Sequence, residues 1–154
     1  MKNLKPFSTL EKTIEYSFKD ISILENAMNH SSYANEAREE YFKNNERMEF
    51  LGDAVLEFIS SEYLFKKFEK DTEGSLSKIR ASLVCEGSLS AFAKEIDLGS
   101  YIFLGRGEEE HGGRARTSIL ENSFECLIAA IFLDGGIEQA KKFVLKFLDR
   151  EKNF

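Results

Sequence analysis

Three acidic residues, Glu46, Glu49 and Asp53, follow one another at spacings of three and four in a chain of 154 residues. With 3.6 residues per helical turn, this spacing places all three carboxylates on one face of a helix. Like charges roughly 6 Å apart repel, so a bound cation would stabilise them. Mg²⁺ suits such a face because it takes a few carboxylates and keeps several waters. The spacing predicts a Mg²⁺ site, where Mn²⁺ is expected to substitute; a solvated acidic face is the alternative.

A second polar pair, Asn122 and Glu125, is spaced by three residues in an otherwise apolar stretch. The pair lies off the apolar stripe that contains Phe124. A polar pair embedded in such a helix needs a partner if it is buried. We therefore expect the two helices to pack so that their polar side chains converge on a metal ion.

The elements that must position these residues are helices, and the predicted fold class is all-α. Helical periodicity and start signals predict a helix after Ser8, another after Asp20, and further helices over 46–68, 72–84, 88–96, 117–133 and 137–150. Only 101–104 has any strand character. The stretches 31–44 and 105–116 are predicted loops.

The second predicted loop carries four glycines among charged residues. Its amides, with Arg106, Arg114 and Arg116, could contact phosphates, and a flexible surface loop is an equally good interpretation.

The composition indicates one globular domain, with 42% hydrophobic residues and 31% charged residues. No stretch approaches the roughly 18 apolar residues of a membrane span, so a cytoplasmic protein without a membrane partner is expected. The sequence contains no HExxH motif and no nucleophile, His and acid at catalytic spacing, which leaves zinc protease and serine hydrolase chemistry without support. The net charge of −6 indicates, taken alone, that a polyanion is not the partner.

Five segments carry a family resemblance. In order along the chain they are HSSYANE (30–36), NERMEFLGDAVLEF (45–58), EGSLSKIRASLV (73–84), LGRGEEEHGGRARTSIL (104–120) and ENSFECLIAAIFLDGG (121–136). Together they resemble the catalytic domain of ribonuclease III over essentially the whole chain, 1–154, without the double-stranded RNA-binding domain that usually follows. The resemblance implies an all-α homodimer that cleaves double-stranded RNA with Mg²⁺.

Residue roles follow from the same resemblance. It implies that Asp53 is the catalytic acid, that Glu49 binds metal and that Glu125 is a metal ligand essential for cleavage. Position 122 is usually Asp in the family, so Asn122 would bind metal through a neutral oxygen and more weakly.

Three further residues resemble family positions. Glu46 and Glu73 resemble supporting acids of the dimer's catalytic valley, and Phe50 resembles an aromatic knob that inserts into the partner subunit; an ordinary core Phe is the alternative. The implied products carry 5′ phosphates and two-nucleotide 3′ overhangs, in processing of rRNA and mRNA. Bound ions would reverse the local acidic charge where a phosphate arrives.

Two other functions stay open at this point. Asn122, natural or deliberately introduced, would make the chain a weakened or silent dimerisation or RNA-binding domain. The chain would otherwise be a helical interaction module with solvated acids.

Overall fold

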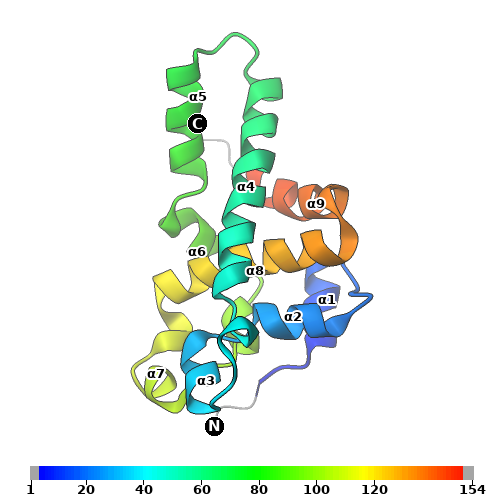
Figure 1. Cartoon of the computed structure of the whole chain (residues 1–154). Helices are drawn as coiled ribbons and strands as arrows, with labels where there is room; N and C mark the ends of the chain where they lie inside the picture. Colours follow the sequence, from blue (N-terminus) through cyan, green and yellow to red (C-terminus); the bar gives the residue numbers. More distant parts are fainter. Residues whose placement is uncertain (1–3, 151–154) are drawn as a thin grey trace.

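The computed structural model describes residues 4–150 and is helical there, as predicted (Figure 1). The helices are α1 (Phe7–Ile14), α2 (Ile21–Ala27), α3 (Ser31–Glu36), α4 (Glu46–Lys67), α5 (Glu73–Leu83), α6 (Glu86–Glu95), α7 (Arg106–Glu110), α8 (Thr117–Gly135) and α9 (Ile137–Leu148), with 3₁₀ turns at Tyr41–Lys43, Leu98–Tyr101 and Gly113–Ala115. The predicted domain limits, 1 and 154, lie outside the described residues. Among the helices of the described part, none is long and apolar enough to cross a membrane.

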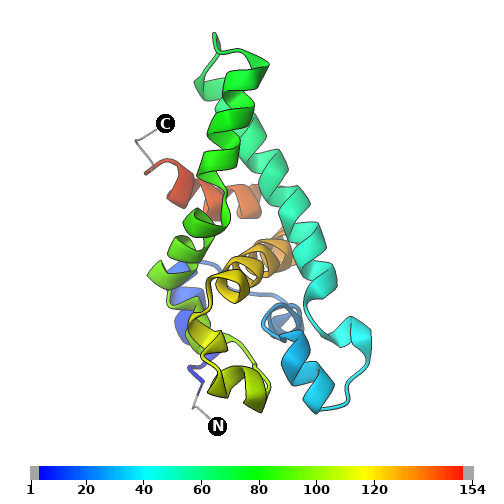
Figure 2. The same ribbon diagram turned by 90° about the vertical axis from the view of Figure 1, so that its left-hand side faces the viewer.

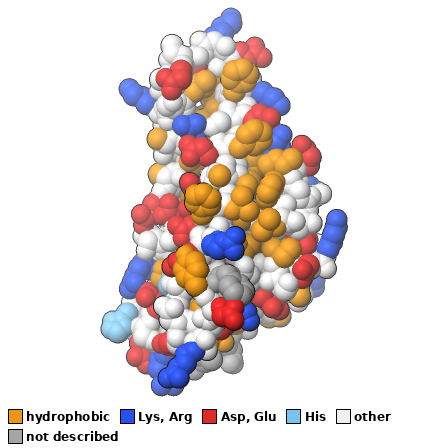
Figure 3. Space-filling view, viewed as in Figure 1, with side chains coloured by type: hydrophobic (Ala, Val, Ile, Leu, Met, Phe, Trp, Pro, Cys, Tyr) orange, Lys and Arg blue, Asp and Glu red, His pale blue; other side chains and the backbone are white. Residues whose placement is uncertain are grey.

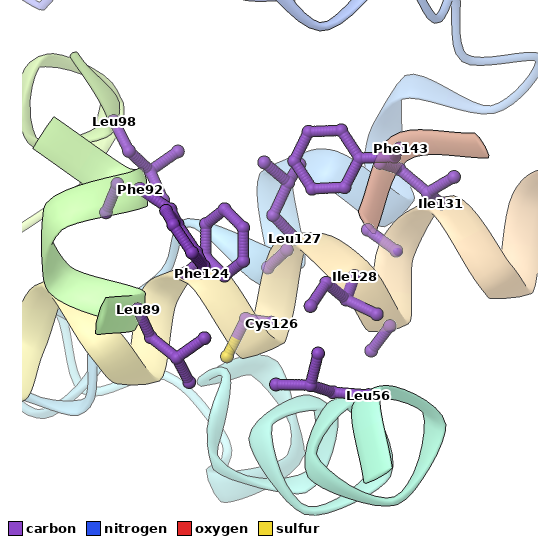
Figure 4. Close-up of a cluster of buried hydrophobic side chains, with 14 of the residues drawn as sticks. Leu56, Leu89, Phe92, Leu98, Phe124, Cys126, Leu127, Ile128, Ile131 and Phe143 are labelled. Atoms are coloured by element: carbon purple, nitrogen blue, oxygen red, sulfur yellow. The ribbon is translucent and has the colours of Figure 1, made fainter. Parts of the chain in front are cut away.

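Helix α8 forms the centre of the core. It packs against α2, α4, α6 and α9, and Figure 4 shows its apolar side chains reaching toward several of these helices. The rings of Phe124 and Phe92 lie 5.9 Å apart, and Phe124 also contacts Phe143 and Phe147 of α9. A helix enclosed on most sides keeps its apolar residues from water around its whole circumference, which is why α8 reads as apolar almost throughout.

Helices α4 and α5 form an antiparallel hairpin that extends beyond the rest of the molecule (Figures 1 and 2). Thr72 caps α5 by accepting a hydrogen bond from the backbone N–H of Ser75 at 3.1 Å. Within α5 only Leu83 is fully buried. Beyond its contact with α4, helix α5 therefore has little support from the remainder of its own chain.

The prediction of a loop over 31–44 is wrong, because a helix and a 3₁₀ turn occupy most of it. His30 caps the helix in this stretch: its ring nitrogen Nδ1 accepts the backbone N–H of Ser32 at 3.1 Å and so starts α3. The expected start at Ser8 is also displaced, since α1 begins after Pro6 without a side-chain cap.

The predicted loop over 105–116 is likewise ordered as α7 and a 3₁₀ turn. The carboxylate of Glu36 accepts the backbone N–H of Arg106 at 2.7 Å, which holds the start of α7 against α3. The segment is thus tied to the helical body rather than extended into solvent. The possible strand over 101–104 is reduced to one isolated bridge between Phe103 and Asn29.

Candidate active site

Helix α4 has three distinct faces. Its core face holds the buried residues Met48, Gly52, Val55, Leu56 and Ile59. Its acidic face holds Glu46, Glu49 and Asp53, and a third, exposed face holds the aromatic residues Phe50, Phe58 and Phe65. The 3.6-residue period separates these sets, so one helix packs against the core, carries acids and leaves aromatic rings in solvent.

Buried asparagines fix the start of α4. Asn45 donates its side-chain N–H to the carbonyl of Ala27 at 3.0 Å, and its backbone N–H to the carbonyl of Asn29 at 2.9 Å. The side-chain oxygen of Asn44 accepts the backbone N–H of Glu46 at 2.9 Å. The two bonds of Asn45 attach the start of α4 to Ala27 of α2 and to Asn29, and the first turn of α4 carries Glu46 and Glu49.

Helix α8 crosses α4 beside those acids. The buried thiol of Cys126 donates to the carbonyl of Asn45 at 3.2 Å, and the backbone of Glu125 lies against Gly52. The crossing buries Glu125, a residue only 5% exposed, and places its carboxyl in a hydrogen bond with the carboxyl of Asp53, an exposed residue. The predicted convergence of acids from two helices is therefore present, and it opens to solvent at Asp53.

The electrostatics of this cluster disfavour ionised carboxylates. Burial, the hydrogen bond to Asp53 and the nearby negative charges raise the pKa of Glu125 to about 9. Burial, with Glu46 and Asp53 close by, also raises the pKa of Glu49. Within residues 4–150, no Lys or Arg forms an ion pair with Glu49, Asp53 or Glu125. The cluster therefore carries excess negative charge. Bound protons reduce this charge, and no Lys or Arg side chain of the described residues neutralises it.

Glu121 belongs to the same cluster, although it is not among the residues that the sequence predicts for the site. Burial, then Glu86, Glu49 and Asp53, raise its pKa. Around the axis of α8, the Glu121 side chain points about 100° away from that of Asn122. Glu121 lies one turn before Glu125, however, so these two side chains share a face of the helix. The i, i+4 spacing was the signal that could have identified it.

The remaining site residues are placed as follows. Glu46 lies close enough to Glu49 to affect its pKa, and Asn122 is half-buried on α8. Glu73 lies elsewhere. Arg80 of α5 pairs with Glu57 at 3.1 Å, and α5 runs antiparallel to α4, so Glu73 lies near the end of α4 farthest from Glu49. Helix α4 spans roughly 30 Å at 1.5 Å per residue, and one chain therefore does not bring these two acids together.

The arginines of the stretch 105–116 are mostly engaged within the chain. Arg114 donates to the carbonyls of Gly99 and Ile102 at 2.6 and 2.7 Å and pairs with Glu109. Arg116 pairs with Glu108. Of the three arginines predicted as possible phosphate contacts, two have carboxylate partners, and Arg106 is exposed.

The chemistry of the cluster fits a hard divalent cation. Two carboxyl groups in contact and a third beside them, all in excess negative charge, are oxygen ligands of the type that Mg²⁺ and Mn²⁺ prefer. Within the described residues, no group of three His, Cys, Asp or Glu side chains is arranged to hold a metal ion as it stands. The carboxylates would therefore supply only part of the ligand set, and the waters that Mg²⁺ usually keeps would supply the rest.

Comparison with known proteins connects this arrangement to a family. The model of the Ribonuclease-III-like family matches residues 20–151. Ribonuclease 3 of Sulfurovum sp. (strain NBC37-1) is 49% identical over 146 residues, 95% of this chain and 63% of the relative. Ribonuclease 3 of Caldanaerobacter subterraneus subsp. tengcongensis is 51% identical over 136 residues, 88% of this chain and 59% of the relative. The chain thus spans about three fifths of these curated relatives.

Solved structures give the same result. The nuclease domain of ribonuclease III from Campylobacter jejuni superimposes with a TM-score of 0.88 at 42% identity, covering 97% of this chain and 100% of that one. That structure is described as flexible in a region involved in dimer formation. A second structure of the same domain has a TM-score of 0.87 and covers 98% and 99% of the two chains.

Proposed function

Because the chain belongs to the ribonuclease III family, as a nuclease domain, we propose that it is a Mg²⁺-dependent endoribonuclease that hydrolyses double-stranded RNA as a homodimer. Its products would carry 5′ phosphates and two-nucleotide 3′ overhangs, and its role would be in cytoplasmic processing of rRNA and mRNA. The observation that carries this proposal is the contact between the carboxyl groups of Asp53 and Glu125, from two helices, without a cationic side chain to neutralise them.

Glu49, Asn122 and Glu125 would hold the metal ion. When bound, Mg²⁺ would neutralise charge on the scissile phosphate and lower the pKa of an attacking water. Asp53 lies at the exposed side of the pair, where it would orient that water. Binding requires ionised ligands, so the proton that Glu125 keeps must leave as the cation enters.

Asn122 sets the affinity of this site for cations. It offers a neutral oxygen where the family usually offers a charged one, and a lower ligand charge weakens binding of a hard cation. Glu121 adds a negative charge nearby without changing the neutral character of Asn122. We expect a working site of reduced Mg²⁺ affinity.

The homodimer proposal rests on the exposed face of α4. Phe50 is 82% exposed, and Figure 3 shows apolar side chains gathered along this helix. Exposed aromatic rings at this density are typical of a protein–protein contact. A second copy packed on this face would cover Phe50. In such a dimer, Glu73, which is remote from the acidic cluster of its own chain, would come close to the acidic cluster of the second copy.

Cleavage of long duplex RNA tests the proposal. The purified chain is incubated with the RNA at low salt with Mg²⁺ or Mn²⁺, beside Glu125→Gln and Asn122→Asp variants. We expect the wild type to cut, Glu125→Gln to lose activity by at least 100-fold, and Asn122→Asp to need less Mg²⁺ for half-maximal rate. Product ends are read by sequencing.

The alternative function, a silent dimerisation or RNA-binding domain, is favoured by Asn122 alone. It is correct if the wild type does not cut and Asn122→Asp does. If neither protein cuts while both are folded and dimeric, the proposed nuclease site is wrong.

A further inference from the structure

Gly52 stands at the crossing of the two helices that carry the acids. A Cβ atom at this position would lie 1.8 Å from the carbonyl oxygen of Glu125 and 2.6 Å from its carbonyl carbon. Both atoms belong to the backbone of α8, so rotation of a side chain cannot relieve the overlap. Only glycine permits this separation of the two helices.

The close approach coincides with the acidic cluster. Asp53 follows Gly52 directly, Glu49 precedes it by three residues, and Glu125 is the residue that it touches. A second contact at the same crossing joins the Cys126 thiol to the carbonyl of Asn45. In Figure 4, the sulfur of Cys126 points from α8 toward the ribbon of α4. The backbone of α8 is therefore seated on the first two turns of α4.

A methyl group at residue 52 would have to displace one of the helices. Nonbonded Cβ contacts closer than 3.0 Å are essentially absent from proteins, so the oxygen of Glu125 must move by more than about 1 Å. Because Glu125 supplies both that oxygen and the buried carboxyl, the movement is transmitted to the site without an intervening side chain.

We propose that Gly52 is a positioning residue, whose lack of a side chain sets the separation at which the Glu125 carboxyl meets those of Asp53 and Glu49 for cation binding. This inference rests on the proposed function. Gly52 contributes no ligand atom; it determines where the ligands from α8 stand relative to those from α4. A displacement of about 1 Å in a catalytic constellation costs on the order of 100-fold in rate.

The test compares Gly52→Ala with two control variants. Gly107→Ala adds the same methyl group at a glycine where a Cβ meets no atom within 4 Å. Leu56→Ala leaves a cavity on the core face of the same helix and lowers stability without adding bulk at the crossing. Mn²⁺ affinity is measured by calorimetry without RNA, at a temperature where circular dichroism shows each variant folded. The kcat and KM for duplex RNA are measured separately.

We expect Gly52→Ala to bind Mn²⁺ at least tenfold more weakly and to lose on the order of 100-fold in kcat, with the KM for RNA within twofold of the wild type. Both controls should keep the affinity of the wild type. A folded Gly52→Ala protein with unchanged Mn²⁺ affinity overturns the proposal, and so does a loss matched by Leu56→Ala, because that loss reflects stability alone.

If Gly52→Ala does not fold, the Mn²⁺ affinity of a Cys126→Val variant is the deciding measurement, because this substitution adds bulk at the same helix crossing beside Asn45. Weakened Mn²⁺ binding by this folded variant supports the role of the close approach, and unchanged binding overturns it. A wild type that neither binds Mn²⁺ nor cuts RNA contradicts the proposed function itself, which separates that failure from a failure of the role of Gly52.

Discussion

At the scale of single residues, Glu125 determines how the site responds to protons. Its carboxyl is buried against that of Asp53, and its pKa rises to about 9 because the ionised form is desolvated and faces other acids. The folded protein therefore keeps a proton that the unfolded chain releases above pH 4.5. Cations and protons compete for the same oxygens, so Mn²⁺ affinity should increase with pH.

The same proton predicts how stability depends on pH. Without metal, the folded state binds more protons than the unfolded state between pH 4.5 and about 9, so the free energy of unfolding decreases as pH rises through this range. Each pKa unit corresponds to about 1.4 kcal/mol. Glu125→Gln keeps a donor for Asp53 and does not ionise, so its stability should change less with pH.

Thermal unfolding in chelator at pH 5 and pH 8.5 measures this difference. Glu110→Gln, at an exposed position, is the control and should behave as the wild type. Equal pH dependence in wild type and Glu125→Gln would show that Glu125 does not hold the proton.

At the scale of elements, the start of α4 connects the fold to the site. The Asn45 side chain is 4% exposed and donates to the last turn of α2, while its carbonyl accepts from the α8 thiol. One residue thus links three helices at the turn that carries Glu46 and Glu49. A buried polar network of this kind tolerates little loss, because each unmade bond leaves a polar group without water.

We therefore expect Asn45→Ala to destabilise the fold by about 1–3 kcal/mol, because the carbonyl of Ala27 loses a buried donor. For a chain of this size the melting temperature should fall by several degrees. Denaturant unfolding, with exposed Asn35→Ala as the control, measures the change. A loss below about 0.5 kcal/mol, which is the level of a surface substitution, contradicts the assigned role.

At the scale of the whole molecule, the tip of the hairpin formed by α4 and α5 extends away from the core (Figure 1). Helix α5 packs mainly against α4 and buries only Leu83, while α4 exposes Phe58 and Phe65 as well as Phe50. A second copy on this face would remove those rings from water and stabilise the hairpin.

Phe50→Ser should weaken a homodimer at least tenfold, because burying a Phe side chain contributes about 1.5–3 kcal/mol. Sedimentation equilibrium measures the dissociation constant, and Ile21→Ser removes an exposed apolar side chain outside α4 as the control. An unchanged dissociation constant for Phe50→Ser would place the dimer contact elsewhere.

Much of this protein could be predicted from its sequence because the relevant signals are local. Helical period and capping residues predicted the all-α class and most helix positions, and spacing along one helix grouped Glu46, Glu49 and Asp53. The stretches 31–44 and 105–116 were misread as loops. Glu36 holds the start of α7 from 70 residues away in the chain, which periodicity does not report. His30 caps α3 locally, but His is not among the usual capping residues.

Tertiary structure alone decided which acids meet. The contact of Asp53 with Glu125, the inclusion of Glu121 and the remoteness of Glu73 all depend on how α8 crosses α4 and where α5 extends. That crossing is set by a backbone contact at Gly52, between residues far apart in the chain. A sequence specifies the face on which a side chain lies, because the helical period is local. The distance between the facing sides of two helices depends on how closely the helix backbones pack, and this is decided by the tertiary structure.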